Sequence, residues 1–194
     1  MCERYTFTVS KYPRYNIARG HHAPVGLGER TGDMRWGLLA PWRGHGDKRG
    51  PMIYVAPLAE IDRTPLLRNA RKRQRCLVLA DGFYAWRQLA TKRQPYWIHP
   101  AAPRAIAFAG LWATHADDGR ASFAIVTVPA NALVAPISET MPALADAAWL
   151  ADGTLAAPGD DWRADAVSTW VNNVAHDDPR CIAPLANPAQ GELF

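Results

Sequence analysis

The sequence is poor in cysteine and lacks any long apolar run. Its three cysteines, Cys2, Cys76 and Cys181, are far apart, and none stands in a C-x-x-C pair. This spacing argues against both a zinc site and a disulfide framework. No apolar run approaches the ~20 residues that a membrane span requires. Charged residues follow Met1 at once, where a signal peptide needs an apolar region, so the expected location is cytoplasmic.

Several functional signatures are also missing. The chain has no G-x-G-x-x-G loop, Walker sequence, H-E-x-x-H pair or G-x-S-x-G elbow. These absences argue against dinucleotide-binding enzymes, P-loop NTPases, zinc proteases and α/β-hydrolases. The adjacent His21 and His22 would point apart on regular structure, which disfavours a metal site there. We expect no cofactor, no metal and no membrane partner.

The composition is that of a folded protein. With 194 residues, 48% of them hydrophobic, the chain is long enough for one domain over residues 1–194. The formal net charge is +4. Basic residues concentrate between Arg63 and Arg75, which is either the solvated face of a helix or a patch that faces phosphates.

Local patterns predict a mixture of strands and helices. Thr64 and Pro65 suit the start of a helix that runs through the basic segment. A second helix is expected over 143–152, ended by Gly153. Short runs rich in β-branched and aromatic residues predict strands at 34–42, 76–80, 95–100, 105–113, 121–128 and 166–171. The strands do not alternate regularly with helices, so the expected class is α+β, with a curved or barrel-like mixed or antiparallel sheet and flanking helices.

Cys2 has a chemical possibility that the other cysteines lack. If Met1 is removed, Cys2 carries a free α-amine beside its thiol, and such a 1,2-aminothiol closes a five-membered ring on an aldehyde. The alternative is that position 2 is a tolerated small residue at a frayed terminus. Trp42 lies beside Arg43 in a segment rich in glycine and cations, an arrangement that stacks an unpaired base and holds its phosphate.

A set of segments in one order gives a broad resemblance. They are MCER (1–4), RYNIA (14–18), RWGLLAPW (35–42), RCLVLADGFYAW (75–86), QPYWI (94–98), AGLW (109–112), VTVPAN (126–131), ISETMP (137–142) and VNNVAHDDP (171–179). Together they resemble the SOS-response-associated peptidase (SRAP) family, also called abasic-site processing proteins. The resemblance runs from Cys2 to about Pro184, and residues 5–13 are shorter than the corresponding segment of the family.

The resemblance implies a function. It implies an α+β domain that binds single-stranded DNA, removes its own Met1, and joins Cys2 to the aldehyde of an abasic site as a thiazolidine. This covalent protein–DNA linkage shields the lesion, in keeping with a DNA damage or SOS response and a prokaryotic or phage setting. It further implies that Arg4, Asn16 and Trp42, with the neighbouring Arg43, lie at the DNA. We expect a monomer.

The sequence departs from the family pattern at the residues that assist the cysteine. The family's asparagine is replaced by Tyr54 or Val55, its proton-transferring glutamate by Ala85, and its histidine by Ser138. The glycine after the cysteine is Glu3, and Glu3 or Glu139 is a candidate substitute carboxylate. Two hypotheses follow: a protein that cross-links abasic sites through Cys2, or a pseudoenzyme that binds single-stranded DNA or a partner without covalent chemistry.

Overall fold

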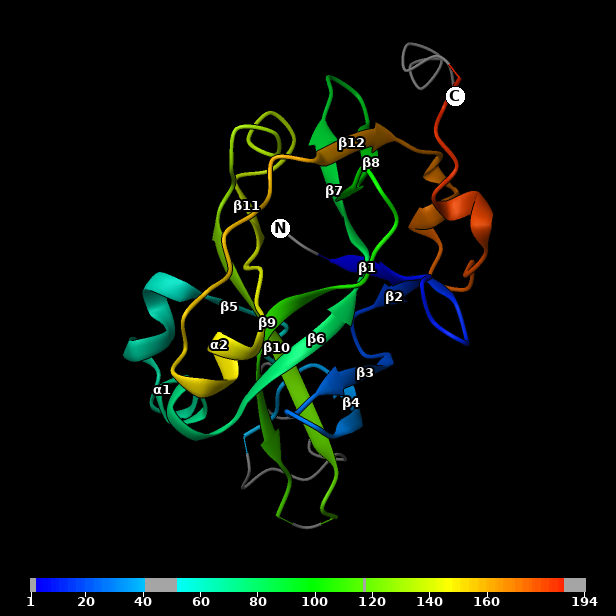
Figure 1. The fold of residues 1–194 in the computed structure, drawn as a ribbon. Helices are drawn as coiled ribbons and strands as arrows, with labels where there is room; N and C mark the ends of the chain where they lie inside the picture. Colours follow the sequence, from blue (N-terminus) through cyan, green and yellow to red (C-terminus); the bar gives the residue numbers. More distant parts are fainter. Residues whose placement is uncertain (1–2, 41–51, 117, 187–194) are drawn as a thin grey trace.

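Two β-sheets dominate the computed structural model, which describes residues 3–40, 52–116 and 118–186. One sheet has five antiparallel strands in the order β12-β8-β7-β1-β2 (Figure 1). We call it the N-terminal sheet, because the first strand lies within it. Its strands are β1 (Arg4–Phe7), β2 (Arg14–Ala18), β7 (Gly82–Gln88), β8 (Arg93–Pro100) and β12 (Trp162–Ala166).

The second sheet closes on itself as a small barrel. Strand β10 pairs with β4 and with β9, and the ring runs from β4 through β3 and β6 back to β9. Two short strands, β5 and β11, add to β10 outside this ring. The strands are β3 (His22–Gly26), β4 (Thr31–Trp36), β5 (Val55–Pro57), β6 (Arg75–Ala80), β9 (Ile106–Thr114), β10 (Ala121–Pro129) and β11 (Thr140–Pro142).

The expected α+β class and the barrel-like sheet are confirmed. Strand β10 runs parallel to β4 and to the added strand β5, so the barrel sheet is mixed. All pairings in the N-terminal sheet are antiparallel. The strands predicted at 76–80, 95–100, 105–113 and 121–128 correspond to β6, β8, β9 and β10. The predicted strand 34–42 is shorter, because β4 ends at Trp36 and Gly37 follows with a φ of +135°, a conformation that favours glycine.

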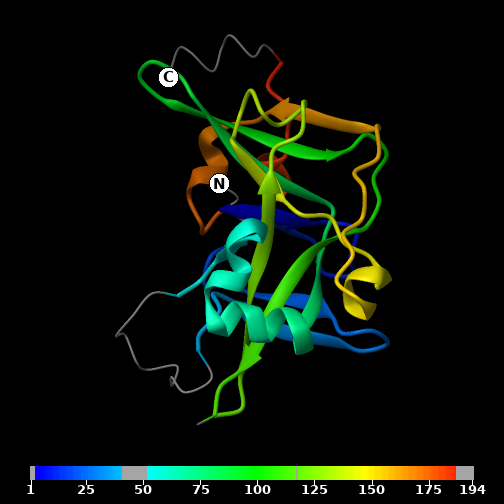
Figure 2. The same ribbon diagram turned by 90° about the vertical axis from the view of Figure 1, so that its left-hand side faces the viewer.

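The helices cover the barrel (Figure 2). The basic helix α1 (Pro65–Arg73) follows the 3₁₀ segment η1 (Leu58–Arg63) and buries Leu67 and Ala70. Thr64 stands at its N-cap as predicted, although its side chain makes no capping hydrogen bond. The predicted helix 143–152 is reduced to α2 (Ala147–Ala151). It starts late because the backbones of Ala143 and Ala145 instead bond to the barrel strands β9 and β10.

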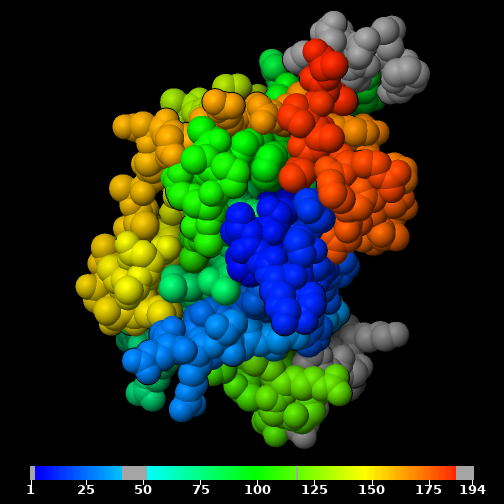
Figure 3. All heavy atoms as spheres, turned by 45° about the vertical axis from the view of Figure 1, so that its right-hand side comes forward, coloured from blue at the N-terminus to red at the C-terminus, as the bar shows by residue number. Residues whose placement is uncertain are grey.

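The C-terminal segment wraps the outer face of the N-terminal sheet. The predicted strand 166–171 is wrong: β12 ends at Ala166, and a 3₁₀ turn, η2 (Thr169–Asn172), follows. Ser168 caps that turn by accepting a hydrogen bond from the Trp170 amide. A second turn, η3 (Pro179–Cys181), comes after it. Figure 3 shows the N-terminal residues lying between the green β7–β8 region and this orange-to-red segment.

Candidate functional site around the N-terminal strand

Arg4 anchors the first strand to the C-terminal segment. Its guanidinium donates to the carbonyl oxygens of Val171 and Asn172, the latter at 2.6 Å, and to Oδ1 of Asn16 at 3.2 Å. It also lies over the Trp86 ring, 5.9 Å from the ring centroid. Burial lowers the pKa of Arg4, but a guanidinium still keeps its charge at neutral pH. The first residue of β1 is therefore fixed to the C-terminal segment.

Asn16 is the buried partner in this arrangement. It is fully buried, and its Nδ2 donates to the carbonyl oxygens of Val171, Asn173 and His176 at 3.1, 3.0 and 2.7 Å. An amide nitrogen has two N–H groups, so one of them is shared between two acceptors. Asn16 thus holds the C-terminal segment against β2, and any part it takes in DNA binding is through the position of that segment.

Asp177 completes the attachment from the other side. Its carboxylate accepts hydrogen bonds from the backbone N–H groups of Tyr15 and Asn16 and from Nε of Arg14, the last at 2.5 Å. These bonds satisfy the start of β2, which is an edge strand of the N-terminal sheet. The VNNVAHDDP segment therefore works as a clamp on RYNIA, and the two segments, distant in sequence, form one unit.

Asp81 fixes the opposite end of β1. This buried carboxylate accepts from the side chain of Thr6, from the side chain and backbone of Thr8, and from the backbone of Val9. Next to it, a Cβ at Gly82 would stand 2.4 Å from Nε1 of Trp97. The Asp-Gly pair joins β6 of the barrel to β7 of the N-terminal sheet.

The positions that lack the expected assisting residues lie in or next to the largest apolar cluster, or on short strands and loops near it. Ala85 is buried in one apolar cluster with Tyr5 of β1, and Tyr54 and Ile137 pack against the same cluster. Ser138 follows Ile137 directly, and its hydroxyl donates to the Thr140 carbonyl at 2.9 Å. Val55 lies in β5, opposite Ile125. Of the three replaced positions, Ala85 lies within this cluster, the position of Tyr54 or Val55 lies at its edge or in β5, and Ser138 follows a residue packed against it.

Glu3 and Tyr54 are linked through Arg19. The Glu3 carboxylate lies 4.0 Å from the Arg19 guanidinium, which lies over the Tyr54 ring at 5.2 Å from its centroid. Tyr54 also crowds Gly37, where a Cβ would stand 3.0 Å from the ring. A carboxylate, a guanidinium and a phenol therefore stand beside the start of β1, whereas Glu139 is exposed on the loop before β11.

The comparisons with known proteins agree with this geometry. A family model described as SOS response associated peptidase (SRAP) matches residues 1–190. The chain belongs to the SRAP family. Among SRAP relatives, abasic site processing protein YoqW from Bacillus subtilis is 29% identical over 193 residues, which span 88% of this chain and 86% of YoqW.

Two further relatives extend beyond the matched region. Abasic site processing protein YoaM from Bacillus subtilis is 31% identical over 140 residues, covering 68% of this chain and 61% of YoaM. Abasic site processing protein HMCES from Gallus gallus is 30% identical over 196 residues, covering 79% of this chain and 57% of HMCES. The matches thus span less than two thirds of the length of YoaM and of HMCES.

Solved structures support the SRAP fold. A crystal structure of a protein from Bacteroides thetaiotaomicron superposes with a TM-score of 0.72 at 19% identity, over 88% of this chain and 84% of that one. A phage-related protein from Bordetella bronchiseptica gives a TM-score of 0.65 at 24% identity, over 86% and 94% of the two chains. At these identities the likeness concerns the fold alone.

The cysteines of this SRAP protein differ in chemical character. Cys76 and Cys181 are fully buried. Burial raises the pKa of the Cys76 thiol far above its ordinary value, and it raises the pKa of Cys181 as well. Since the thiolate is the nucleophile, neither is suited to covalent chemistry. Cys2 lies outside the described residues.

The loop that carries Trp42 and Arg43 also lies outside the described residues, but its two ends are fixed. Leu38 and Ile53 exchange backbone hydrogen bonds at 2.8 and 3.1 Å. The Leu39 amide donates to the Ser122 hydroxyl at 3.1 Å, and Ser122 is 3.0 Å from Nε2 of the buried His115. The described residues on either side of 41–51 therefore bond to each other and to β10 of the barrel. The predicted roles of Trp42 and Arg43 stay predictions.

Sequence reasoning missed several residues that shape this site. Asp81, Trp86 and Asp177 stand in the family segments, but none of them was among the predicted site residues. Trp86 is only partly buried, donates to Oδ1 of Asn172 at 2.9 Å, and has Arg93 as well as Arg4 beside its ring. An acidic residue inside an otherwise apolar run was the available signal for Asp81.

Two negative findings apply to the described part of the chain. Within it, no group of three or more His, Cys, Asp or Glu side chains is arranged to hold a metal ion. No helix in it is long and apolar enough to span a membrane.

Proposed function

We propose that this SRAP protein processes abasic sites by forming a covalent link between Cys2 and single-stranded DNA after Met1 is removed. One observation carries the proposal: a cysteine stands at position 2 of a chain that matches the SRAP model from residue 1. The relatives named abasic site processing proteins support the same lesion as substrate. The hydrogen bonds of Arg4 fix the chain two residues after Cys2.

The covalent step follows from the chemistry of an aminothiol. The α-amine of Cys2 adds to the aldehyde carbon of the ring-opened sugar, and loss of water gives an iminium ion. The thiolate then adds to the same carbon, so that one C–N and one C–S bond replace the C=O bond. The net reaction joins aldehyde and aminothiol to give a thiazolidine and water, with no oxidant or cofactor.

Proton transfer in this protein depends on an altered set of groups. Ala85 and Ser138 supply neither a carboxylate nor an imidazole, and each lost general acid or base typically costs about 10²–10⁴ in rate. Glu3 is adjacent to Cys2 in the chain, and its carboxylate is held 4.0 Å from Arg19. Glu3 is the proposed substitute base, and the reaction is expected to be slow because ring closure proceeds with little other assistance.

The DNA contacts proposed for this site form two groups. Arg4 and the Trp42–Arg43 pair are proposed to contact the strand, with Arg43 meeting a phosphate and Trp42 stacking on a base. Asn16 acts on the DNA indirectly, because it is buried and holds the C-terminal segment next to Arg4.

A denaturing gel tests the proposal. The purified protein is mixed with a single-stranded oligonucleotide that contains one abasic site, and a slowly migrating band is expected. The band should be absent with Cys2→Ala and with an undamaged oligonucleotide. Cys2→Ser keeps the amine but lacks the thiol, so it should give a band only when borohydride traps the imine. An intact mass that still includes Met1 would rule out the thiazolidine.

A second candidate is a pseudoenzyme that binds single-stranded DNA or a partner without covalent chemistry. Ala85 and Ser138 are the observation that favours it. Native binding without a covalent band would support this alternative and contradict the cross-link. Absence of both would contradict both DNA functions.

A further inference from the structure

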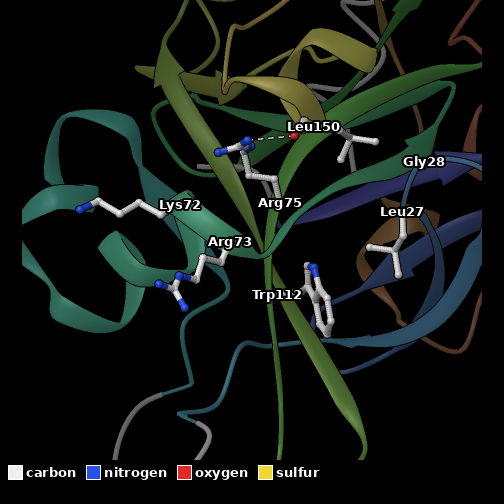
Figure 4. Close-up of a pocket in the computed structure, with 7 residues that line it drawn as sticks. All are labelled: Leu27, Gly28, Lys72, Arg73, Arg75, Trp112 and Leu150. Carbon is white, nitrogen blue, oxygen red and sulfur yellow. Dashed lines mark hydrogen bonds between the residues drawn. The ribbon is translucent and has the colours of Figure 1, made fainter.

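A recess on the barrel lies at the end of the basic helix. It has a volume of about 420 Å³ and opens between the last turn of α1, the β3–β4 turn and α2 (Figure 4). That volume is within the range of sites for small molecules. Its lining residues are Leu27, Gly28, Lys72, Arg73, Arg75, Trp112 and Leu150.

The polar side chains around this recess are all hydrogen-bond donors. Lys72, Arg73, Arg75 and Trp112 carry N–H groups and no acceptor, and none of the lining residues is a carboxylate. Arg75 Nε is buried and has no acceptor in the described part of the chain. Nor does the Trp112 indole N–H bond to any described residue. A ligand that satisfies these donors has to bring its own negatively charged oxygens.

Arg75 offsets the negative C-terminal ends of the two helices that border the recess. The C-terminus of a helix is electrically negative and would repel an anion. Arg75 donates to the carbonyl of Arg71 in α1 and to those of Leu150 and Ala151 in α2, at 2.5, 2.9 and 3.0 Å. These bonds neutralise both helix ends. Lys72 and Arg73 remain exposed at the rim, and within the described structure neither pairs with a carboxylate.

The apolar part of the lining adds a second requirement. Trp112 and Leu27 lie on one side of the space and Leu150 lies above it, with the indole nitrogen of Trp112 turned toward Arg75 (Figure 4). An indole beside aliphatic side chains accommodates a planar ring, since bases stack on aromatic faces with little sequence preference. Phosphate oxygens and a planar ring occur together in a nucleotide.

We propose that this recess binds a phosphate-bearing nucleotide unit, either a free nucleotide or one within a DNA strand. The phosphate lies at the rim cations Lys72 and Arg73, within the positive field of the partly buried Arg75, and the base lies against Trp112. The recess lies on the barrel and includes no residue of the N-terminal sheet, so the inference stands apart from the proposed function of Cys2.

The test follows the indole N–H signal of Trp112 in ¹H–¹⁵N NMR spectra of the full chain. Comparison with Trp112→Phe identifies this signal among those of the eight tryptophans. The probes are inorganic phosphate, deoxyadenosine monophosphate and an undamaged oligothymidylate. The Trp112 signal is expected to shift with deoxyadenosine monophosphate or with the oligonucleotide. Because the oligonucleotide carries no aldehyde, Cys2 chemistry does not enter the result, and failure of the cross-link would leave this result unchanged.

Charge reversal provides the matched comparison. K72E/R73E should weaken nucleotide binding by about tenfold or more, because it replaces the two exposed cations at the rim of the recess with carboxylates that repel a phosphate. R63E/R68E changes the charge by the same amount on exposed positions of the same basic segment and should leave the Trp112 shift in place. A shift at lower concentration with the oligonucleotide identifies DNA as the source of the phosphate, and the reverse identifies a free nucleotide. No shift with any probe, or equal loss in both double variants, would overturn the proposal.

Discussion

Asn16 shows how much one buried amide does in this protein. It links Arg4 of the first strand to three carbonyl groups of the C-terminal segment, so a single side chain positions parts of the chain more than 150 residues apart. Removing the amide takes one hydrogen bond from each of these carbonyls, although the Val171 carbonyl keeps its bond from Arg4. An unsatisfied buried polar group costs more than a hydrogen bond contributes, so the loss should be large.

We expect Asn16→Ala to lower the free energy of unfolding in urea by about 3 kcal/mol. Asn69→Ala is the matched control, because Asn69 is an exposed asparagine on α1 and should change the stability by less than about 0.5 kcal/mol. Hydrogen exchange should also accelerate over residues 170–177. Equal stability of the two variants would contradict the role assigned to Asn16.

His21 gives the fold a dependence on pH. Its Nδ1 accepts the Ala18 N–H at 3.3 Å, which requires an unprotonated nitrogen. Burial, with the nearby Arg14 charge, lowers the pKa of His21 below its ordinary value of 6.5. The unfolded chain therefore binds this proton more readily than the folded chain, and the contribution of His21 to stability is present above pH 6.5 and lost as the pH falls below it.

Thermal unfolding at pH 7.5 and pH 5.5 measures this effect. The wild type should lose more stability between the two pH values than His21→Gln, which cannot take up the proton. His22→Gln alters the neighbouring exposed imidazole and should keep the wild-type decline. A decline of the same size in all three proteins would show that other groups cause it.

Strands β6 and β7 follow each other in the chain but lie in different sheets, so the turn between them is one of the connections between the barrel and the N-terminal sheet. The chain passes from one sheet to the other at Asp81 and Gly82. Asp81 takes four hydrogen bonds from residues 6–9, so the junction also sets the position of β1. Any function that uses the start of β1 therefore depends on this junction.

Asp81→Asn should destabilise the protein by about 2 kcal/mol, because an amide has one acceptor oxygen where the carboxylate has two and its N–H₂ group would face other donors. Gly82→Ala should destabilise it by about 1–3 kcal/mol, because the methyl group would meet Trp97 at 2.4 Å. Urea denaturation measures both changes. Gly119→Ala is the comparison without a steric clash, because nothing lies within 4 Å of a Cβ there. Its φ of +68° still adds a backbone strain cost, which is expected to be smaller than the clash at Gly82. If Asp81→Asn were as stable as the wild type, the carboxylate would not hold β1.

The sequence was informative about elements wherever local pattern and burial agree. Strands β6, β9 and β10 are dense in apolar residues and lie in the barrel, so their runs were readable. The segment 166–171 has a similar composition, but Ser168 caps a 3₁₀ turn there and tertiary contacts replace strand pairing. The helix expected at 143–152 lost its first turn to backbone bonds with neighbouring strands, which local propensity does not encode.

The candidate site was predictable in part. The order of the family segments identified the fold and the replaced positions Tyr54 or Val55, Ala85 and Ser138, and the structure shows that Ala85 and Tyr54 belong to one apolar cluster. The clamp between Asp177 and β2 was not predictable, because nothing local relates two segments that far apart. The burial of Asn16 was also missed, since the same residue in RYNIA suits either a turn or a ligand contact.

At the scale of the whole molecule, the basic charge has consequences for binding. The chain carries a formal net charge of +4, and exposed cations gather along α1. If about three phosphates are contacted, affinity for an undamaged oligonucleotide should fall about tenfold or more between 50 and 200 mM NaCl. Fluorescence anisotropy measures this directly. An affinity that does not change with salt would contradict binding through phosphate contacts.

Cys2, freed of Met1, is proposed to supply both the amine and the thiol that bond to the aldehyde carbon of an abasic site. The most direct measurement is mass spectrometry of the cross-linked complex after digestion with nuclease and trypsin, which cleaves after Arg4. The account predicts that the sugar remnant is found on the peptide Cys2–Arg4, without Met1 and with the mass of a thiazolidine. A remnant on a lysine-containing peptide, or a terminal peptide that is unmodified and still begins with Met1, would contradict it.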